Sequence, residues 1–169
     1  MLADPSALEA VADSLAKLGA NGVDAEALQG VRILAGVPAI PADAGPGDLP
    51  QEAGLERDAV SFDKGCYLGQ EVMARLKSLG HVNRALCRVL MKGDAPFSAG
   101  NEPVPLYAGE VAAGELRSRA GEAGLAMLKI RAIAGRESLS LTPKGEEVVS
   151  LKAETAWGLT VPPTAAGQS

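Results

Sequence analysis

The chain of 169 residues has a mass of 17.2 kDa, and 30 alanines and 20 glycines fill 50 of its positions. Phe, Trp and Tyr together number only five, so the hydrophobic core must consist mainly of Leu, Val and Ile. Charged residues make up 22% of the chain and the net charge is -5. This composition, without collagen periodicity or low-complexity tracts, argues against the disordered and fibrous classes and indicates a globular protein.

The sequence offers no candidate for a membrane span or a targeting peptide. Its longest apolar stretch, residues 33–42, is ten residues long and contains two prolines, which is too short and too broken to cross a membrane. The N-terminus carries no basic residue and no continuous apolar core, unlike a signal or transit peptide. A cytoplasmic protein that makes no membrane contact is therefore expected.

Two helices are predicted at the front of the chain. Asp4, which is followed by proline, reads as an N-cap, and apolar residues then recur at helical spacing as far as Leu18. Asp24 is predicted to cap a second helix that ends at Gly36, because prolines follow at once. The apolar positions that define this second helix are Leu28, Val31 and Leu34.

The middle of the chain is predicted to be irregular. Residues 38–58 are rich in proline and glycine and form either a linker or a wrapping loop. A short strand is expected over residues 59–62, followed by a glycine-bracketed turn and a helix over residues 70–79. Within that helix, Glu71 and Arg75 are four positions apart, a spacing that favours helix formation.

From residue 82 the hydrophobic pattern changes to a period of two, which is typical of a strand. Short apolar runs then alternate with glycine- and proline-containing turns, and five or six such antiparallel strands are expected to close into a small barrel. The predicted fold class is α+β. We expect residues 1–81 to form a helical and loop region, residues 82–157 a C-terminal β-barrel, and residues 158–169 a disordered tail.

Positive charge is concentrated between Ser61 and Lys92. This island contains six Lys or Arg residues and two Asp or Glu residues, giving +4, so the rest of the chain carries -9. Such an island attracts an anionic ligand or partner, or it is simply a solvated surface. With Tyr67 as its one aromatic residue, it lacks stacking platforms, and direct nucleic-acid binding is not expected.

The densest run of unusual residues is KGCYLGQE, residues 64–71. Gly65 permits a close backbone approach beside Cys66, whose thiol precedes a predicted helix with an N-terminus that favours negative charge. With Lys64 as a positive neighbour, these features favour a nucleophilic, redox-active or metal-binding thiolate. The alternative is that Cys66 is buried, as expected for Cys87 in an alternating strand. Two cysteines and one histidine cannot form a four-ligand zinc site, and no metal is expected.

The run KGCYLGQE resembles the K-G-C-[FY]-x-G-Q-E signature of the YgfZ family, folate-binding relatives of the glycine-cleavage T-protein, an aminomethyltransferase. The resemblance covers about residues 24–90, and the β-rich remainder is similar in position and pattern. Its other matching positions are Arg32-Ile33, Ala35-Gly36, Pro38, Asp43, Leu49-Pro50-Gln51-Glu52, Ala74-Arg75, Gly80 and Asn83-Arg84-Ala85-Leu86. The sequence departs from the family at Leu34, where the family has an acidic residue.

The resemblance implies a fold of three parts arranged around a tetrahydrofolate cavity. Of this fold, the chain would hold the latter half of the middle part and the C-terminal barrel. Family members are longer than this chain, so the resemblance implies either a piece of a longer protein or a natural short form. We therefore expect the isolated chain to bind folate poorly.

The function that the resemblance implies is that of a tetrahydrofolate-binding accessory protein for iron-sulfur cluster assembly or repair, linked also to tRNA modification. Its partners would be iron-sulfur client proteins or assembly factors. Cys66 would be the working thiol and Lys64 would tune it. The implied motif residues are Gly65, Tyr67, Gly69, Gln70, Glu71 and Arg75, and the implied folate contacts are Arg32 and Asp43.

Two other functions stay open. One is an aminomethyltransferase that passes a one-carbon unit to tetrahydrofolate, although in the relatives that chemistry uses a carboxylate and not a cysteine. The other is a non-catalytic binding module that docks an anionic partner on the basic island. A classical enzyme is not expected, and an enzymatic form would be a folate-dependent transferase.

Overall fold

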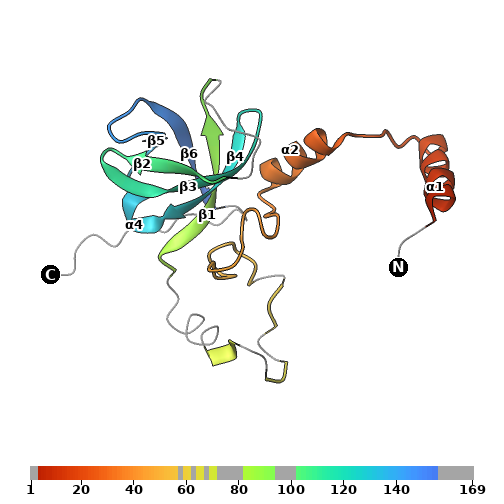
Figure 1. Cartoon of the computed structure of the whole chain (residues 1–169), viewed down its shortest axis with the longest axis horizontal. Helices are drawn as coiled ribbons and strands as arrows, with labels where there is room; N and C mark the ends of the chain where they lie inside the picture. Colours follow the sequence, from red (N-terminus) through yellow and green to blue (C-terminus); the bar gives the residue numbers. More distant parts are fainter. Residues whose placement is uncertain are drawn as a thin grey trace.

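A computed structural model describes residues 4–56, 59–61, 64–66, 69–71, 82–93 and 102–155. Two helices precede a β-rich region (Figure 1). The elements in chain order are α1 (Pro5–Lys17), α2 (Ala25–Ala35), β1 (Arg84–Met91), β2 (Val104–Ala108), β3 (Val111–Ala120), β4 (Ala123–Lys129), α4 (Ile130–Ile133), β5 (Ser138–Ser140) and β6 (Glu147–Thr155). No helix in these described ranges is long and apolar enough to cross a membrane.

Both predicted front helices and their caps are confirmed. The Asp4 carboxylate accepts a hydrogen bond from the Ser6 backbone N–H, and Asp24 accepts one from that of Ala27 at 2.7 Å. Gly36 ends α2 in the left-handed conformation with φ of 73°, which glycine adopts without steric cost. The helix α1 lies away from the barrel at the end of an extended stretch, and its apolar residues are exposed (Figure 1).

The six strands form a closed antiparallel barrel, as the sequence predicts. Their order around the barrel is β1-β4-β3-β2-β5-β6, and β1 pairs with β6 to close it. At Gly114, with φ of 152°, β3 comes so close to β4 that an added Cβ would lie 2.1 Å from the carbonyl oxygen of Met127. A residue without a side chain is therefore required at this crossing.

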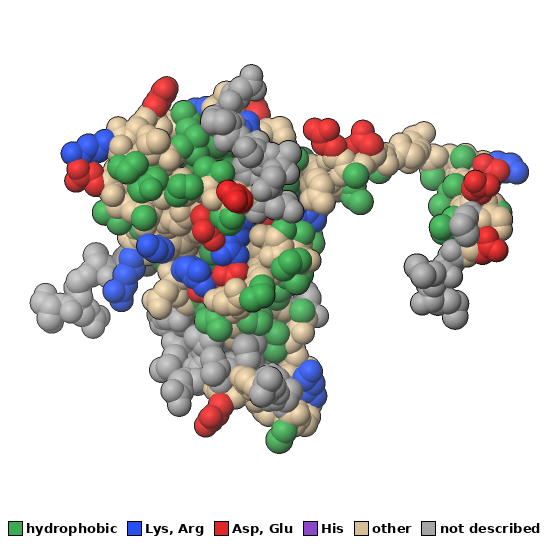
Figure 2. Space-filling model, viewed as in Figure 1, with side chains coloured by type: hydrophobic (Ala, Val, Ile, Leu, Met, Phe, Trp, Pro, Cys, Tyr) green, Lys and Arg blue, Asp and Glu red, His purple; other side chains and the backbone are tan. Residues whose placement is uncertain are grey.

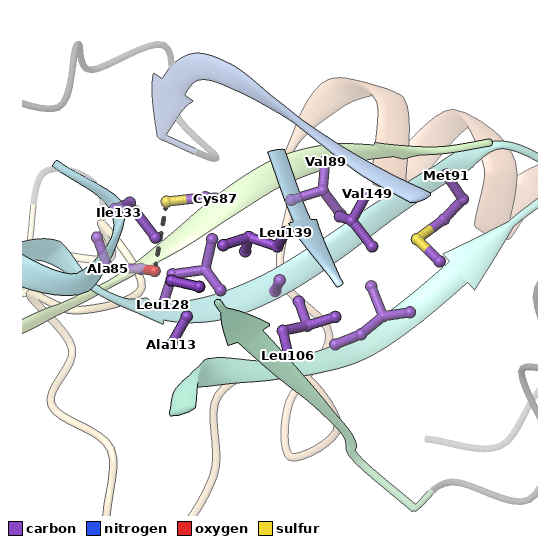
Figure 3. Packing of buried hydrophobic residues seen from close by; sticks show 13 residues of the cluster. Ala85, Cys87, Val89, Met91, Leu106, Ala113, Leu128, Ile133, Leu139 and Val149 are labelled. Carbon is purple, nitrogen blue, oxygen red and sulfur yellow. Dashed lines mark hydrogen bonds between the residues drawn. The ribbon is translucent and has the colours of Figure 1, made fainter. Parts of the chain in front are cut away.

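The barrel interior is filled by aliphatic side chains and one thiol (Figure 3). The buried residues of this cluster are Ala85, Cys87, Val89, Met91, Leu106, Ala108, Ala113, Leu116, Ala126, Leu128, Ile133, Leu139 and Val149. The odd-numbered positions of β1 thus face inward, which confirms the predicted alternation and the prediction that Cys87 is a core residue.

A second apolar cluster lies where α2 packs against the outside of the barrel. The cluster includes Ile33 of α2, Leu86 of β1, and Leu125 and Met127 of β4. The strand β4 is therefore buried on both faces, which explains its continuous apolar sequence.

The predicted face of α2 differs from the buried one. Leu28, Val31 and Leu34 define the predicted apolar stripe, yet all three are exposed, and Ile33 is buried instead. Gly30, one turn before Ile33, faces β3, and a Cβ added to it would lie 3.9 Å from the Cβ of Ala120. A side-chain methyl group at Gly30 would make only an ordinary van der Waals contact, so it is the burial of Ile33 that shows which face of the helix docks.

The connecting segment, which we define as residues 37–56, is a wrapping loop and not a free linker. It consists of successive turns, and Asp43, Ala44, Glu52 and Ala53 are buried in it. The predicted strand over residues 59–62 is wrong for its described part, residues 59–61. There the Ala59 N–H donates to the Leu55 carbonyl at 2.8 Å, which continues the turns of the connecting segment.

Candidate functional site

The motif residues that the structure describes are mostly accessible. Lys64, Gly65 and Cys66 are exposed, and the positive φ of Gly69, 85°, precedes a helix that begins at Gln70. Gln70 is half-buried and Glu71 is exposed. Two of the predicted motif residues, Tyr67 and Arg75, lie outside the described residues.

The two cysteines lie in opposite environments. Cys66 is exposed, whereas Cys87 is 1% exposed. The Cys87 thiol donates a hydrogen bond to the Ala85 carbonyl oxygen, which lies 3.5 Å from the Cys87 Sγ (Figure 3). Burial raises the pKa of the Cys87 thiol to about 12, because the barrel interior disfavours a thiolate. Cys66 is therefore the thiol that a reagent or partner can reach. Its exposure excludes the alternative that Cys66 is a buried cysteine like Cys87.

Arg32 and Asp43, the two predicted folate contacts, form an ion pair with each other. Arg32 Nη1 donates to Asp43 Oδ2 at 2.5 Å, and the Ala39 backbone N–H donates to the same oxygen at 2.8 Å. Arg32 Nη2 also donates to Ser118 Oγ at 3.1 Å, which joins α2 to β3. Asp43 is fully buried, and its Oδ1 has no hydrogen-bond partner among the described residues. A folate contact by this pair stays a prediction.

Glu52 and Arg84 form a second, bidentate pair. Arg84 Nε donates to Glu52 Oε1 at 2.9 Å, and Arg84 Nη2 donates to Oε2 at 2.7 Å. The Leu49 N–H also donates to Oε2, at 3.0 Å. The hydrogen bond with Glu52 is the main reason that the pKa of Arg84 is raised above its ordinary value. This two-point geometry is the strong form of a charged hydrogen bond.

Arg117 on β3 forms the third attachment of the connecting segment. Its Nη1 donates to the Asp43 carbonyl at 3.0 Å and to Asp48 Oδ2, and its Nη2 donates to Glu115 Oε1 at 2.6 Å. Burial opposes the charge on Arg117, but the hydrogen bonds with Asp48 and Glu115 outweigh it and raise the pKa of the guanidinium. Asp48 also contacts Arg84 at 3.2 Å, so the second and third attachments share a carboxylate.

Together these groups form what we term the arginine cluster: Arg32, Arg84 and Arg117 with Asp43, Asp48 and Glu52. Figure 2 shows blue and red side chains interleaved where the barrel meets the rest of the chain. Four of these residues belong to the sequence resemblance. The other two, Asp48 and Arg117, carry no motif, and the single sequence signal for Arg117 is its position in an alternating strand.

The arginine cluster also accounts for part of the basic island. Arg84 is paired with carboxylates of the connecting segment, and Arg88 Nη1 donates to the Leu34 carbonyl at 2.8 Å. The acidic residues that offset this charge lie outside the island in the sequence. Within the part of the chain that the structure describes, no group of three or more His, Cys, Asp or Glu side chains is placed to hold a metal ion.

Comparison with known proteins identifies the barrel. A family profile described as "CAF17, C-terminal beta-barrel domain" matches residues 84–159. Residues 84–159 are thus similar in sequence to the CAF17 C-terminal barrel. The match begins at the first residue of β1, so the CAF17 barrel includes all six strands described above.

Individual relatives extend the similarity beyond the CAF17 barrel. The chain is 40% identical over 105 residues to the mitochondrial iron-sulfur cluster assembly factor IBA57 of Mus musculus, an alignment that spans 59% of this chain and 29% of that protein. The human IBA57 is 39% identical over 108 residues, or 62% of this chain and 30% of that protein. The tRNA-modifying protein YgfZ of Sodalis glossinidius is 42% identical over 71 residues, or 41% of this chain and 22% of that protein.

These matches confirm the resemblance to the YgfZ family that the motif indicates. The chain spans less than a third of the length of these relatives, at 29%, 30% and 22%. The relatives are named for iron-sulfur cluster assembly and for tRNA modification.

Proposed function

We propose that this chain is the cysteine-bearing loop and barrel of an accessory protein for iron-sulfur cluster assembly or repair, and that Cys66 is its working thiol. The observation that carries the proposal is the exposure of Cys66 within KGCYLGQE while Cys87 is sealed in the barrel. The names of the IBA57 and YgfZ relatives support the client class, which is iron-sulfur proteins or their assembly factors. A link to tRNA modification follows if a tRNA-modifying enzyme is among those clients.

The chemistry we propose at Cys66 is that of an accessible thiol. Lys64, two positions earlier, adds a positive charge to the same exposed segment. Gly69, with φ of 85°, takes a left-handed conformation that other residues rarely adopt, whereas Gly65 has no positive φ. The roles of Gln70 and Glu71 in this segment, as ligands or as the first helical turn, stay predictions.

Tetrahydrofolate is the proposed cofactor, yet the described residues do not form a site for it on their own. Each nitrogen of Arg32 already donates within the protein, to Gln29, Val37, Asp43 and Ser118. Asp43 Oδ1 is a spare acceptor that would suit an N–H donor, but Asp43 is fully buried. The Leu34 side chain, at the position of the family's acid, offers no hydrogen bond. We therefore propose that folate binding needs protein surface beyond these residues.

The test is complementation of cells that lack the native accessory factor. A full-length relative carrying this segment should restore the activity of an iron-sulfur enzyme, and Cys66→Ser should abolish the restoration. Cys87→Ala is the matched control, because it removes the other thiol from a site that no partner reaches. Equal restoration by Cys66→Ser would remove Cys66 from the mechanism.

A further inference from the structure

Asn21 and Gly22 lie in the extended stretch between α1 and α2 (Figure 1). Residues 18–24 are all exposed, and residues 20–24 belong to no helix, strand or turn. Within the part of the chain that the structure describes, neither Asn21 nor Gly22 makes a hydrogen bond. A Cβ added at Gly22 would meet no atom within 4 Å. The peptide group that joins the two residues is therefore open to water and unrestrained.

An asparagine followed by glycine holds a nucleophile and an electrophile in reach of each other. The Gly22 backbone nitrogen loses its proton to a solvent base and attacks the Asn21 Cγ. As the bond between this nitrogen and Cγ forms, the Cγ–Nδ2 bond breaks, and the side-chain nitrogen takes up a proton and leaves as ammonia. The two reacting atoms are linked through three atoms of Asn21, so the reaction is intramolecular. Gly22 carries no Cβ that would shield its nitrogen.

Water then opens the five-membered succinimide at one of its two carbonyl carbons. Addition at Cγ restores the ordinary backbone and leaves aspartate at position 21. Addition at the backbone carbonyl carbon releases the Gly22 nitrogen from that carbon, and the chain then runs through Cγ as isoaspartate. Both products carry one more negative charge than asparagine. Isoaspartate also lengthens the connection between α1 and α2 by one backbone carbon.

Asn83 provides a contrast within the same chain. It is also exposed, but its backbone carbonyl accepts a hydrogen bond from the Ile130 N–H at 3.0 Å. That carbonyl belongs to the same peptide group as the Arg84 nitrogen, which would be the nucleophile. Arg84 begins β1 and pairs with Lys129 of β4. The barrel therefore holds this peptide group in place, and exposure of the side chain alone does not make it reactive.

We propose that Asn21 is a site of spontaneous deamidation, which places isoaspartate or aspartate between α1 and α2. The free Asn21–Gly22 peptide group carries the proposal. The isoaspartyl product has a free carboxylate on its α-carbon, so it is a substrate for a carboxyl methyltransferase that recognises isoaspartyl residues. Cys66 takes no part in this chemistry, and the inference is independent of the proposed function.

Incubation of the folded full chain in mildly alkaline buffer tests the proposal, with mass spectrometry of its peptides as the readout. Asn21 should be converted to isoaspartate and aspartate at least about tenfold faster than Asn83 reacts. Because the fold does not restrain Asn21, its rate should be the same in guanidinium chloride, whereas the rate at Asn83 should rise. Transfer of a labelled methyl group by an isoaspartyl carboxyl methyltransferase should mark the peptide that contains position 21.

Gly22→Ala is the decisive variant, and Ala20→Gly is its matched control. Gly22→Ala should slow the reaction at Asn21 at least about tenfold, because the added methyl group shields the nucleophile. Gly22 has no positive φ and open space at its Cβ, so alanine fits there without a change of fold. Ala20→Gly places a glycine on the other side of Asn21 and should leave the rate unchanged.

Hydroxylamine gives a second readout, because it attacks the succinimide and cleaves the chain after position 21. The folded protein should yield fragments 1–21 and 22–169, and Gly22→Ala should resist cleavage. Slower reaction of Asn21 in the folded chain than in guanidinium chloride would show that the fold protects it and would overturn the proposal. Reaction of native Asn83 as fast as that of Asn21, or an unchanged rate in Gly22→Ala, would overturn it as well.

Discussion

Arg117 and Asp48 are 69 positions apart in the sequence, yet both Nη atoms of the Arg117 guanidinium contact the Asp48 carboxylate. The pair ties the outer face of β3 to a turn of the connecting segment, and the Gly45 N–H donates to the same carboxylate at 3.0 Å. A turn rich in proline and glycine has little structure of its own. Its conformation here is therefore imposed by charge pairing with the barrel.

The first prediction concerns acid stability. Burial opposes the charge on Asp48, but the hydrogen bonds from Arg117 and Gly45, with the charges of Arg117 and Arg84, hold its pKa below the ordinary 3.8. The unfolded chain therefore binds a proton at Asp48 more readily than the folded chain does. The contribution of Asp48 to the free energy of unfolding is complete above pH 3.8 and is lost as the pH falls through the lower folded-state pKa. Urea unfolding should show constant stability from about pH 7 to 5 and a decline below about pH 4.

The matched variants for this prediction are Asp48→Asn and Glu110→Gln. Asp48→Asn should flatten the acid decline and cost about 1–3 kcal/mol at neutral pH, because a carboxylate contact with two guanidinium groups is lost. Glu110→Gln removes an ion pair in which both side chains are largely exposed, and it should leave the decline unchanged. Identical pH profiles for wild type and Asp48→Asn would contradict the assignment.

The second prediction concerns the two thiols. Iodoacetamide at about pH 8 should label Cys66 in the folded protein and leave Cys87 unlabelled, because Cys66 is exposed and the pKa of Cys87 is raised to about 12. In guanidinium chloride both cysteines should react at similar rates. Mass spectrometry of the digested protein measures the two sites separately. Labelling of Cys87 as fast as Cys66 in the native state would show that the barrel opens readily.

The third prediction separates the docked face of α2 from its exposed face. Ile33→Ala should lower the free energy of unfolding by about 2–5 kcal/mol, because a fully buried side chain is truncated between α2 and β4. Val31→Ala, two positions earlier and 64% exposed, should change it by less than about 0.5 kcal/mol. Urea denaturation of both variants provides the comparison, and equal effects would contradict the docking through Ile33.

Local features of this fold could be predicted from the sequence. The caps at Asp4 and Asp24, the end of α2 at Gly36 and the inward face of β1 depend on neighbouring residues and on fixed periodicities. The motif was also sufficient to predict the family. Exposure of Cys66, in contrast, required the structure, because spacing alone is compatible with a buried thiol.

The arginine cluster could not be predicted because its partners are far apart in the chain. The separations are 11 positions for Arg32 and Asp43, 32 for Arg84 and Glu52, and 69 for Arg117 and Asp48. No periodicity links such positions. The error in the predicted face of α2 has a similar cause. Its apolar periodicity favours Leu28 and Val31, whereas the docked face is the one that places Ile33 against residues of β1 and β4, which are distant in the sequence.

The pairing of β1 with β6 has a consequence for how the protein is made. The two strands are Arg84–Met91 and Glu147–Thr155, the first and the last strands of the barrel. During synthesis on the ribosome, β1 is therefore made long before the strand with which it pairs. Until Thr155 has left the exit tunnel, one edge of β1 lacks its hydrogen-bonding partner. An unpaired edge is a template for association with other chains. A nascent chain that stalls before β6 is therefore the form of this protein most in need of a chaperone.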